Sequence, residues 1–579
     1  MEAQTQMKKF ISCLLTFVLI LSLMAPLSVC ADGTDTTTVT PDTSWYSNTG
    51  TSSAPVTCYI EDEADLLGFG SLLKTTDFQY EIIVLKNDIT LTQEWNAEKS
   101  SSVAFWGTFD GQGHTITGLK KTSPTSDYGF IPNAGGCTIK NVTFTNVSIT
   151  GSTGATGAVI GYRGAAQNVY FENVHVQGAL SATNQLGGLI GATGNSFTLY
   201  FTDCSFKGTL THTGTTVQGV GGLAGLVYAH INATGCYVDA TIQAKGYAGG
   251  IVGSAHKNNK VGYRALTVAN AYVAGSIATD AGGVGGVGGV CDTVSLTDVV
   301  VAATVQTGTD YVAAFTAQCV DVNTASSFTR CVFTGNMIVN GTNKGIFTGD
   351  GCANVNVNEC LLFASSNVDL PAASFANATS CAVTAEKLYC DTTVYTGLAN
   401  TDGVVNINSM ELGGANGAKN LSALFDEDSR ENWTITDTCP MPTKALKGLN
   451  VANLEMLAFQ TNPEPVTGES YNIRFVGFIN STDYKEAGVI VNNGVKDVKI
   501  PATHVYDSIN EKLGDTTKAS TITKYGYAEN DGHFLAIVLK DVPASVTSFT
   551  VTPYVVTNDG VIVYGVSGTA TVTVETVTE

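Results

Sequence analysis

The chain has 579 residues, a formal net charge of −21 and only 14% charged residues, with 62 glycines and 13 prolines. The acidic balance argues against a nucleic acid or an anionic membrane as partner, because both require clustered Lys and Arg. The low charge and low proline content exclude a disordered chain and predict an ordered, strand-rich protein of two or three domains.

The N-terminus has the layout of an export signal. Lys8 and Lys9 precede an apolar run over 10–23, and Val29-Cys30-Ala31 has the small-residue spacing of a cleavage site. We predict that residues 1–31 are a signal peptide and that the mature protein is extracellular or on the cell surface, without a membrane span. A membrane anchor is the alternative, although the run is short for one.

Two further features surround this signal. Residues 27–30 resemble a lipoprotein box in which Val29 is bulky for its position, so lipidation of Cys30 stays open. Residues 32–57 are rich in Thr, Ser, Asp and Gly and are predicted to be a flexible linker. Apolar residues over 61–73 recur at helical spacing, which predicts a short amphipathic helix that caps the strand-rich region.

A strand pattern then repeats eight times. In each copy the alternation of apolar residues skips one position, which marks a corner that keeps the apolar side inward. The predicted corners, spaced 27 to 35 residues apart, are Asn146, Asn173, Asp203, Gly235, Asn270, Asp298, Arg330 and Glu359. Six of them are Asn, Asp or Gly, the residues that best tolerate a left-handed backbone. The residue that follows each corner is predicted to point into the core, and so is the residue two positions further along the chain. On stacked coils these residues form two inward-facing columns.

A glycine motif lies between the corners. Residues 187–191 read Gly-Gly-Leu-Ile-Gly, and similar motifs occupy 221–225, 249–253 and 285–289. Each motif is predicted to add a second short strand to its repeat. A unit of this kind cannot bury its apolar side alone, but stacked copies form a continuous core. The fold class is therefore all-β, with a right-handed parallel β-helix of eight or more coils and its caps over 58–450.

The C-terminal part has another pattern. Residues 451–468, with Pro463 and Pro465, are predicted to be a linker. Over 469–579, six alternating stretches separated by turn signals predict a small β-sandwich.

These motifs carry a family resemblance. Gly-Thr-Phe-Asp-Gly-Gln-Gly-His-Thr-Ile over 107–116 resembles the entry coil of pectin-lyase-like β-helix proteins, and the glycine motifs resemble the GLUG motif of bacterial surface proteins. Trp433 and residues 442–446 are similar to the closing segment of such helices. The sandwich resembles an Ig-like module of secreted proteins from gut Firmicutes. The resemblance implies an architecture; the fold hosts lyases, hydrolases and adhesins alike.

No convergent catalytic group emerges from the sequence. Asp203, Asp239, Asp298 and Asp321 lie on different coils without paired carboxylates. Asp110 and His114 are the most tempting pair, but we interpret them as turn residues of the entry coil. Arg330 and Glu359 occupy one corner position on consecutive coils and are predicted to form a surface salt bridge. We therefore assign no catalytic, cofactor-binding or metal-binding residue and no cofactor.

The cysteines leave two interpretations open. Of the 14, Cys13 and Cys30 lie in the signal, and the even remainder in an exported protein suggests disulfides. However, Cys204 is predicted to stack on Cys236, and Cys331 on Cys360. Stacked neighbours keep their Cβ atoms about 4.8 Å apart, against about 3.8 Å in a disulfide. Buried free thiols are therefore favoured.

Two functions remain. The first is a non-catalytic exported scaffold or adhesin that binds a polysaccharide or a host or cell-surface glycoprotein. Its candidate sugar-stacking residues are Tyr170, Tyr200, Tyr237 and Tyr272, of which Tyr170 and Tyr272 have outward parity. The alternative is a polysaccharide lyase or glycoside hydrolase built on the helix.

Overall fold

The computed structural model describes most of residues 38–407 and 433–574. The longer gaps inside these ranges are 257–263, 363–381, 396–401, 446–453 and 507–531, and the predicted signal peptide lies outside the described residues. The chain forms two compact units, Met1–Val39 and Thr40–Glu579, and all of the described helices and strands belong to the second. No helix among the described residues is long and apolar enough to cross a membrane.

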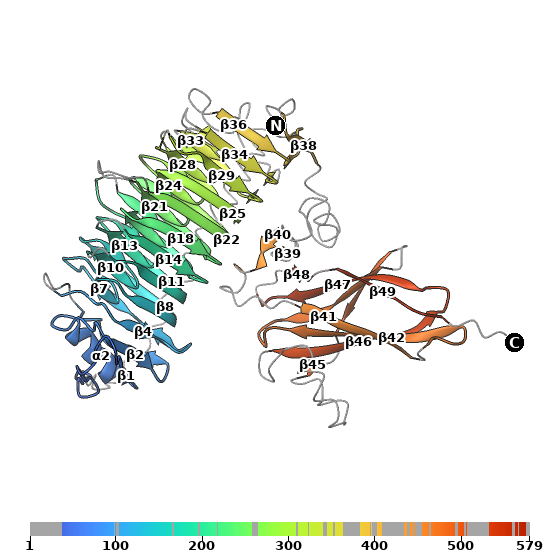
Figure 1. The fold of residues 1–579 in the computed structure, drawn as a ribbon, viewed down its shortest axis with the longest axis horizontal. Coiled ribbons are helices and arrows are strands. Elements are labelled where there is room, and N and C mark those ends of the chain that lie inside the picture. The colour runs from blue at the N-terminus through green and yellow to red at the C-terminus, as the bar shows by residue number, and fades with distance from the viewer. Residues whose placement is uncertain are drawn as a thin grey trace, which may run out of the picture. The chain divides into compact units, whose positions relative to one another are not determined.

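The N-terminal and central part is a parallel β-helix of about nine turns, which confirms the predicted fold class (Figure 1). Its strands form three sheets that we call the long, second and third sheets. The long sheet contains β1 (Val56–Ile60), β2 (Glu81–Leu85), β3 (Ile89–Thr90), β4 (Thr108–Asp110), β5 (Thr115–Thr117), β6 (Lys120–Thr122), β8 (Thr138–Ser152), β11 (Val169–Ala182), β14 (Thr198–Thr202), β15 (Ser205–His212), β18 (His230–Thr234), β19 (Tyr237–Ala244), β22 (Ala265–Thr279), β25 (Thr293–Val301), β26 (Thr304–Thr307), β29 (Ser326–Thr329), β30 (Val332–Phe333), β31 (Asn336–Val339), β34 (Asn354–Asn358), β35 (Leu361–Leu362), β36 (Ala382–Glu386), β37 (Leu388–Cys390) and β38 (Val404–Asn406).

The other two sheets are narrow and consist of one short strand per coil. The second sheet contains β7 (Ile131–Ala134), β10 (Ile160–Arg163), β13 (Ile190–Thr193), β17 (Ala224–Val227), β21 (Val252–Ala255), β24 (Gly288–Cys291), β28 (Thr316–Cys319) and β33 (Thr348–Asp350). The third sheet contains β9 (Thr156–Gly157), β12 (Leu186–Gly187), β16 (Gly219–Gly221), β20 (Tyr247–Gly249), β23 (Val284–Gly285), β27 (Val312–Ala313) and β32 (Lys344–Gly345).

The predicted corners carry the predicted backbone. All eight have a positive φ, between 49° at Arg330 and 69° at Gly235, and Lys387 at 54° extends the series. The register is wrong for the first copy: Glu172 pairs with Lys140 and Val174 with Val142, so Asn173 stacks on Asn141 and not on Asn146. Both asparagines of β8 have a positive φ, and the register shifts between Val176 and Gly178, opposite Asn146. Asn146 is therefore part of a β-bulge, which has the same residue type and backbone conformation as a corner and cannot be distinguished from one in the sequence.

The glycine motifs are corners themselves. In the copy at 187–191, Gly187 ends β12 of the third sheet and Ile190 begins β13 of the second sheet. A Cβ atom on Gly188 would lie 2.0 Å from the carbonyl oxygen of Gly222 and 2.5 Å from the ring of Phe206. Because the backbone and an inward side chain of the long sheet approach this closely, only glycine fits. The motif thus records a contact between opposite walls of the helix.

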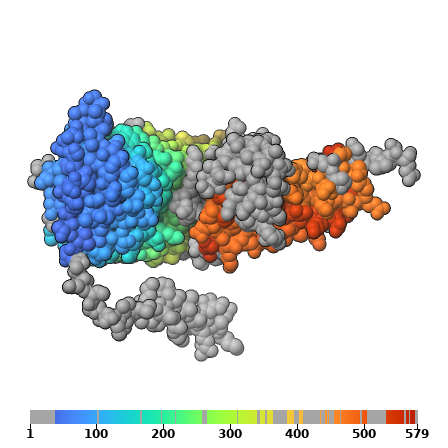
Figure 2. Space-filling view, turned by 90° about the horizontal axis from the view of Figure 1, so that it is seen from below, coloured from blue at the N-terminus to red at the C-terminus, as the bar shows by residue number. Residues whose placement is uncertain are grey.

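The N-terminal helix, α2 (Glu63–Leu72), covers the first coils as predicted. Asp62 caps it by accepting a hydrogen bond from the backbone N–H of Asp65 at 3.1 Å. The ring of Phe69 lies 5.6 Å from those of Phe109 and Phe130, inside the first coils. In the space-filling view the blue cap adjoins the first turns of the β-helix (Figure 2).

This helix is not amphipathic, however, because residues 66–70 are buried without interruption. Its second side is covered by residues expected to belong to a flexible linker. Trp45 Nε1 donates to the carbonyl oxygens of Asp42 and Asp65, at 2.9 and 3.1 Å. The backbone N–H of Asp42 donates to the carbonyl oxygen of Ala64. The described end of that stretch is thus part of the cap.

The C-terminal part consists of two antiparallel sheets that share one core, as a β-sandwich requires. One sheet contains β39 (Trp433–Thr436), β40 (Pro440–Pro442), β43 (Glu486–Asn492), β44 (Asp497–Pro501), β47 (Ser548–Val556), β48 (Ile562–Tyr564) and β49 (Gly568–Thr571). The other contains β41 (Leu454–Asn462), β42 (Ser470–Ile479), β45 (Val505–Tyr506) and β46 (His533–Pro543).

The sandwich extends further toward the N-terminus than the sequence suggested. β41 lies in the stretch expected to be a linker, yet it pairs with β42 over its length. Trp433 and Pro442, expected to close the helix, lie in the hairpin of β39 and β40, and β39 pairs with β48. Pro463 follows β41 directly, so the proline punctuation marked the end of a strand.

Candidate functional site

An open groove of about 290 Å³ lies at the turns that connect strands of the second sheet to the following strands of the long sheet. Four consecutive coils contribute to it, because Thr108 pairs with Thr138, Thr138 with Tyr170 and Tyr170 with Tyr200. Its wall is aromatic and uncharged, being lined by Trp106, Gly107, Thr108, Gly136, Cys137, Thr138, Gln167, Asn168, Tyr170 and Phe197. A concave surface that combines aromatic rings with a few polar groups is a candidate ligand-binding site.

Trp106 is held at one end of the groove by the coils on either side of it. Its backbone N–H donates to the carbonyl oxygen of Asp77 on the preceding coil at 2.7 Å. A Cβ atom on Gly135 would lie 2.4 Å from the indole Cδ2 and Cε2 atoms, so the ring rests directly on that glycine. The indole N–H makes no hydrogen bond with the described part of the chain. Trp106 therefore presents a fixed ring and an available donor.

Tyr170 and Tyr200 form an outward platform on the third and fourth coils. Their rings are stacked, with centroids 4.9 Å apart and an interplanar angle of 9°. Asn168 fixes the edge of the platform: its Nδ2 donates to the hydroxyl of Tyr170 at 3.1 Å, and its Oδ1 accepts from the N–H of Thr198 at 3.1 Å. The amide group thus ties one coil to the next beneath the groove.

A buried arginine supports the other end. Arg163 is fully buried; its Nη2 donates to the carbonyl oxygen of Gln167, and its guanidinium lies 5.5 Å from the centre of the Phe197 ring. The ring itself remains 40% exposed. Burial lowers the pKa of Arg163 to about 10, so the side chain stays charged at neutral pH. Arg163 positions Phe197 and Gln167 from behind.

The thiol in the groove is not a nucleophile. Cys137 is buried, and burial raises its pKa to about 12, although the charge of Arg163 acts in the opposite direction. Only a thiolate attacks readily, and this group stays protonated at neutral pH. The groove therefore offers stacking and hydrogen bonding to a ligand.

A second cluster of polar residues lies at the equivalent turns of later coils, between the second sheet and the long sheet. Tyr228 and His256 follow β17 and β21, and their rings meet edge to face at 6.4 Å. His256 Nδ1 lies 2.7 Å from the hydroxyl of Ser254, while the N–H of Arg264 donates to Asp292 at 2.7 Å. Burial lowers the pKa of His256, with Asp292 acting in the opposite direction, so the imidazole is a neutral base at pH 7.

Asp110 and His114 do not pair with each other. Asp110 is 6% exposed, accepts from the N–H of Gln112 at 3.0 Å, and lies 3.3 Å from Lys140 Nζ. His114 Nδ1 instead lies 3.1 Å from Asp88. Each residue ties turns of the entry coils together.

The predicted salt bridge between Arg330 and Glu359 is wrong in its pairing. Arg330 donates backward to Asp298, from Nε at 2.6 Å and from Nη2 at 3.0 Å. Glu359 accepts forward from Lys387 at 3.1 Å. The corner column alternates in charge from Asp298 to Lys387, so Arg330 has an acidic neighbour on each side, Asp298 and Glu359. The bidentate geometry of the guanidinium selects Asp298.

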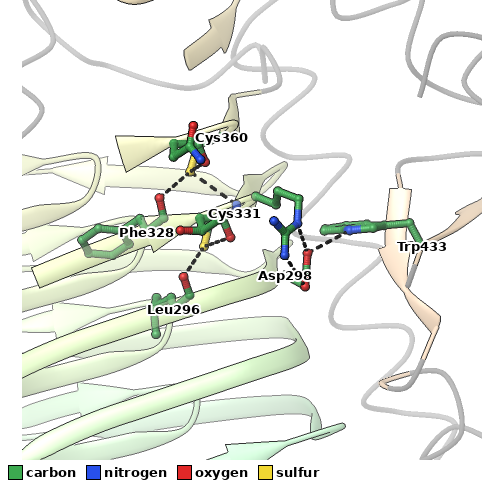
Figure 3. Close-up of polar contacts among 9 residues, drawn as sticks. Leu296, Asp298, Phe328, Cys331, Cys360 and Trp433 are labelled. Atoms are coloured by element: carbon green, nitrogen blue, oxygen red, sulfur yellow. Dashed lines mark hydrogen bonds and ion pairs between the residues drawn. The ribbon is translucent and has the colours of Figure 1, made fainter. Parts of the chain in front are cut away.

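Asp298 also accepts a hydrogen bond from Trp433 Nε1 at 3.0 Å (Figure 3). The tyrosines near this corner do not serve as sugar platforms. Tyr237 is only 6% exposed and stacks on Tyr272, which packs against a core cluster that contains Trp433. Of the four candidate tyrosines, only Tyr170 lines the groove, with Tyr200 stacked on it.

The cysteine columns hold free thiols, as predicted. Cys204, Cys236, Cys331 and Cys360 are all buried and unpaired by disulfides. Each Sγ donates to the carbonyl oxygen of a residue on the preceding coil, for example Cys331 to Leu296 at 3.6 Å and Cys360 to Phe328 at 3.4 Å (Figure 3). The structure adds another stacked pair, Cys291 on Cys319, which the corner pattern did not indicate. Within the described residues, no group of three or more His, Cys, Asp or Glu could hold a metal ion.

No protein-family model and no curated protein matches the chain. Among solved structures it is similar to the enzymatically active domain of tailspike protein 4 of bacteriophage CBA120, with 11% identity and a TM-score of 0.15. The match covers 90% of this chain and 64% of that one. At this score the likeness carries no argument about function.

Proposed function

We propose that this protein is an exported, non-catalytic scaffold that binds a glycan of a polysaccharide or a cell-surface glycoprotein in the groove. The observation that carries the proposal is the juxtaposition of Trp106, Tyr170 and Phe197 on consecutive coils around one concave surface. Aromatic faces stack on the C–H faces of sugar rings, and the groups at their edges bind hydroxyls.

The polar groups of the groove suit this role. Asn168 and Gln167 bring amides to the wall, and the indole of Trp106 adds a donor. Gly135 beneath Trp106 and Arg163 beneath Phe197 hold the two outer rings in place before a ligand arrives. Such preorganisation reduces the entropy lost on binding.

The proposal is tested by affinity electrophoresis of the full chain against immobilised polysaccharides. Retardation by at least one polymer is expected, and Phe197→Ala should abolish it. Tyr59→Ala is the matched control, because this aromatic residue of β1 is 44% exposed and does not line the groove. Equal retardation of the two variants would contradict the proposal.

Glycan cleavage is the second candidate, and the cluster of Tyr228, His256 and Arg264 favours it. His256 is a neutral imidazole whose ring meets that of Tyr228, and the Arg264 side chain donates to the carbonyl oxygen of Tyr228 at 2.9 Å. A neutral base of this kind can abstract the proton beside a carboxylate-bearing carbon, as a lyase requires. Release of unsaturated sugars from polygalacturonate or alginate by the full chain, lost in His256→Asn, would establish this function over the first.

A further inference from the structure

We infer that the groove accepts an uncharged glycan chain of several sugar units lying parallel to the helix axis; this inference rests on the proposed function. Three properties of the groove carry it: the charge of its wall, the direction in which its aromatic residues succeed one another, and the kind of polar group that it exposes.

The wall has no charged side chain to pair with an acidic sugar. All ten lining residues are uncharged. Arg163, directly behind the wall, is fully buried and is engaged by the carbonyl oxygen of Gln167 and the Phe197 ring. Lys140 is paired with Asp110, and Lys99 with Asp127. Recognition of a carboxylate or sulfate uses Arg or Lys at the contact, so an acidic glycan would lose hydration here without a counter-charge.

The aromatic residues follow the axis. Trp106 precedes β4 of the first of the four coils, Tyr170 lies on the third, and Phe197 precedes β14 of the fourth. Adjacent strands are about 4.8 Å apart, so these residues span three steps, or about 14 Å. A single sugar is too short to contact both Trp106 and Phe197, whereas a chain of several units along the axis contacts both.

The polar groups of the groove are of the kind that form hydrogen bonds with sugar hydroxyls. Thr108 and Thr138 are register partners on consecutive coils and are both half-buried. Gln167 is exposed, and the indole N–H of Trp106 has no partner in the described part of the chain. Hydroxyl and amide groups donate and accept hydrogen bonds, which matches the dual character of a sugar hydroxyl.

The test is isothermal titration calorimetry of the full chain with two oligosaccharide series of equal lengths. The neutral series are cello-, xylo- and manno-oligosaccharides, and the acidic series is oligogalacturonate. At least one neutral series should bind with an affinity that rises up to three or four units and then levels off. Oligogalacturonate of the same length should bind about tenfold more weakly or not at all.

A gain-of-function variant keeps the inference falsifiable without disturbing the fold. Gln167 is exposed, so Gln167→Lys should fold normally and raise the affinity for oligogalacturonate, while Gln167→Glu should lower it. Phe197→Ala should shorten the length at which the neutral series levels off.

Different outcomes test the existence of the glycan site, the class of glycan that it binds and the direction in which the glycan lies. Tighter binding of oligogalacturonate than of every neutral series, lost in Phe197→Ala, would overturn the neutral class and leave the groove as a glycan site. Affinity independent of chain length would overturn the axial placement. Failure of the wild-type chain to bind any glycan would overturn the proposed function itself.

Discussion

The rings of Tyr170 and Tyr200 lie face to face, 4.9 Å apart and within 9° of parallel. Their spacing is the rise of one coil, so the β-helix itself sets the stack. Two consecutive coils thus place one tyrosine each at the same register position, and the two rings form one platform. The platform exists before any ligand binds, which is the property expected of a preorganised site.

The first prediction concerns this platform. Tyr200→Ala removes the ring behind Tyr170 and should weaken glycan binding by about 1 kcal/mol, the usual contribution of an aromatic pair. Tyr272→Ala is the matched control, because Tyr272 stacks on Tyr237 away from the groove. Titration calorimetry of both variants checks the prediction, and equal losses of affinity would refute it.

Arg163 should matter for stability and binding together. Arg163→Met keeps the apolar stem but removes the donor to the Gln167 carbonyl oxygen and the cation beside Phe197. The free energy of unfolding should fall by about 2 kcal/mol, because a hydrogen bond from a charged group is lost. Chemical denaturation measures this loss, and the glycan affinity should fall as well. A variant with unchanged stability would show that the arginine does not hold the groove.

The corner column allows one substitution to have opposite effects at neighbouring coils. Arg330→Asn relieves the left-handed backbone by about 1 kcal/mol but leaves the buried Asp298 without its bidentate partner, so it should destabilise. Glu359→Asn gains the same relief and loses only a pair to an exposed lysine, so it should be neutral or stabilising. Unfolding curves that shift in the same direction for both variants would contradict this account.

Buried histidines should make the helix acid-sensitive. Burial lowers the pKa of His212 below its unfolded value of about 6.5, so below that pH the unfolded chain takes up a proton that the folded chain excludes. This contribution to stability is therefore complete above pH 6.5 and is lost as the pH falls. His212→Asn should reduce the slope of stability with pH between about 5 and 7. An unchanged slope in thermal melts across that range would argue against the prediction.

The glycine corners should tolerate no side chain. A Cβ atom on Gly222 would lie 2.1 Å from the carbonyl oxygen of Gly250 and 2.5 Å from Val238 Cγ1. Gly222→Ala should therefore destabilise by about 3 kcal/mol through overpacking. Gly308→Ala, whose nearest neighbour would be 3.8 Å away, should leave the melting temperature unchanged. A Gly222→Ala protein that melts like the wild type would remove the stated reason for the motif.

The helix could be predicted in detail because its constraints recur on every coil. The left-handed corners, the inward columns and the free thiols all arise from one repeated pattern. The register failed only at Asn146, where a bulge within β8 carries the same residue type and backbone as a corner. Local pattern alone does not distinguish the two, and the pairing of Asn173 with the neighbouring coil decides it.

The groove was only half visible in the sequence, through Tyr170 and Tyr200. Trp106, Gln167 and Phe197 lie in turns and belong to no repeated column, so periodicity gives no signal for them. They come together because four coils stack and because Gly135 and Arg163 fix two rings from behind. A Trp just before a strand, with glycine at the equivalent turn of the next coil, is the signal that would have found Trp106, whereas no such signal marks Gln167 or Phe197.

The most direct test of the glycan site is the intrinsic fluorescence of Trp106 during titration with a neutral oligosaccharide of four units. A saturable change in intensity or wavelength is expected in the wild-type chain and in Trp45→Phe, and it should vanish in Trp106→Phe. A change that persists in Trp106→Phe, or no change in a wild-type chain that binds the sugar by calorimetry, would contradict the assignment of the groove.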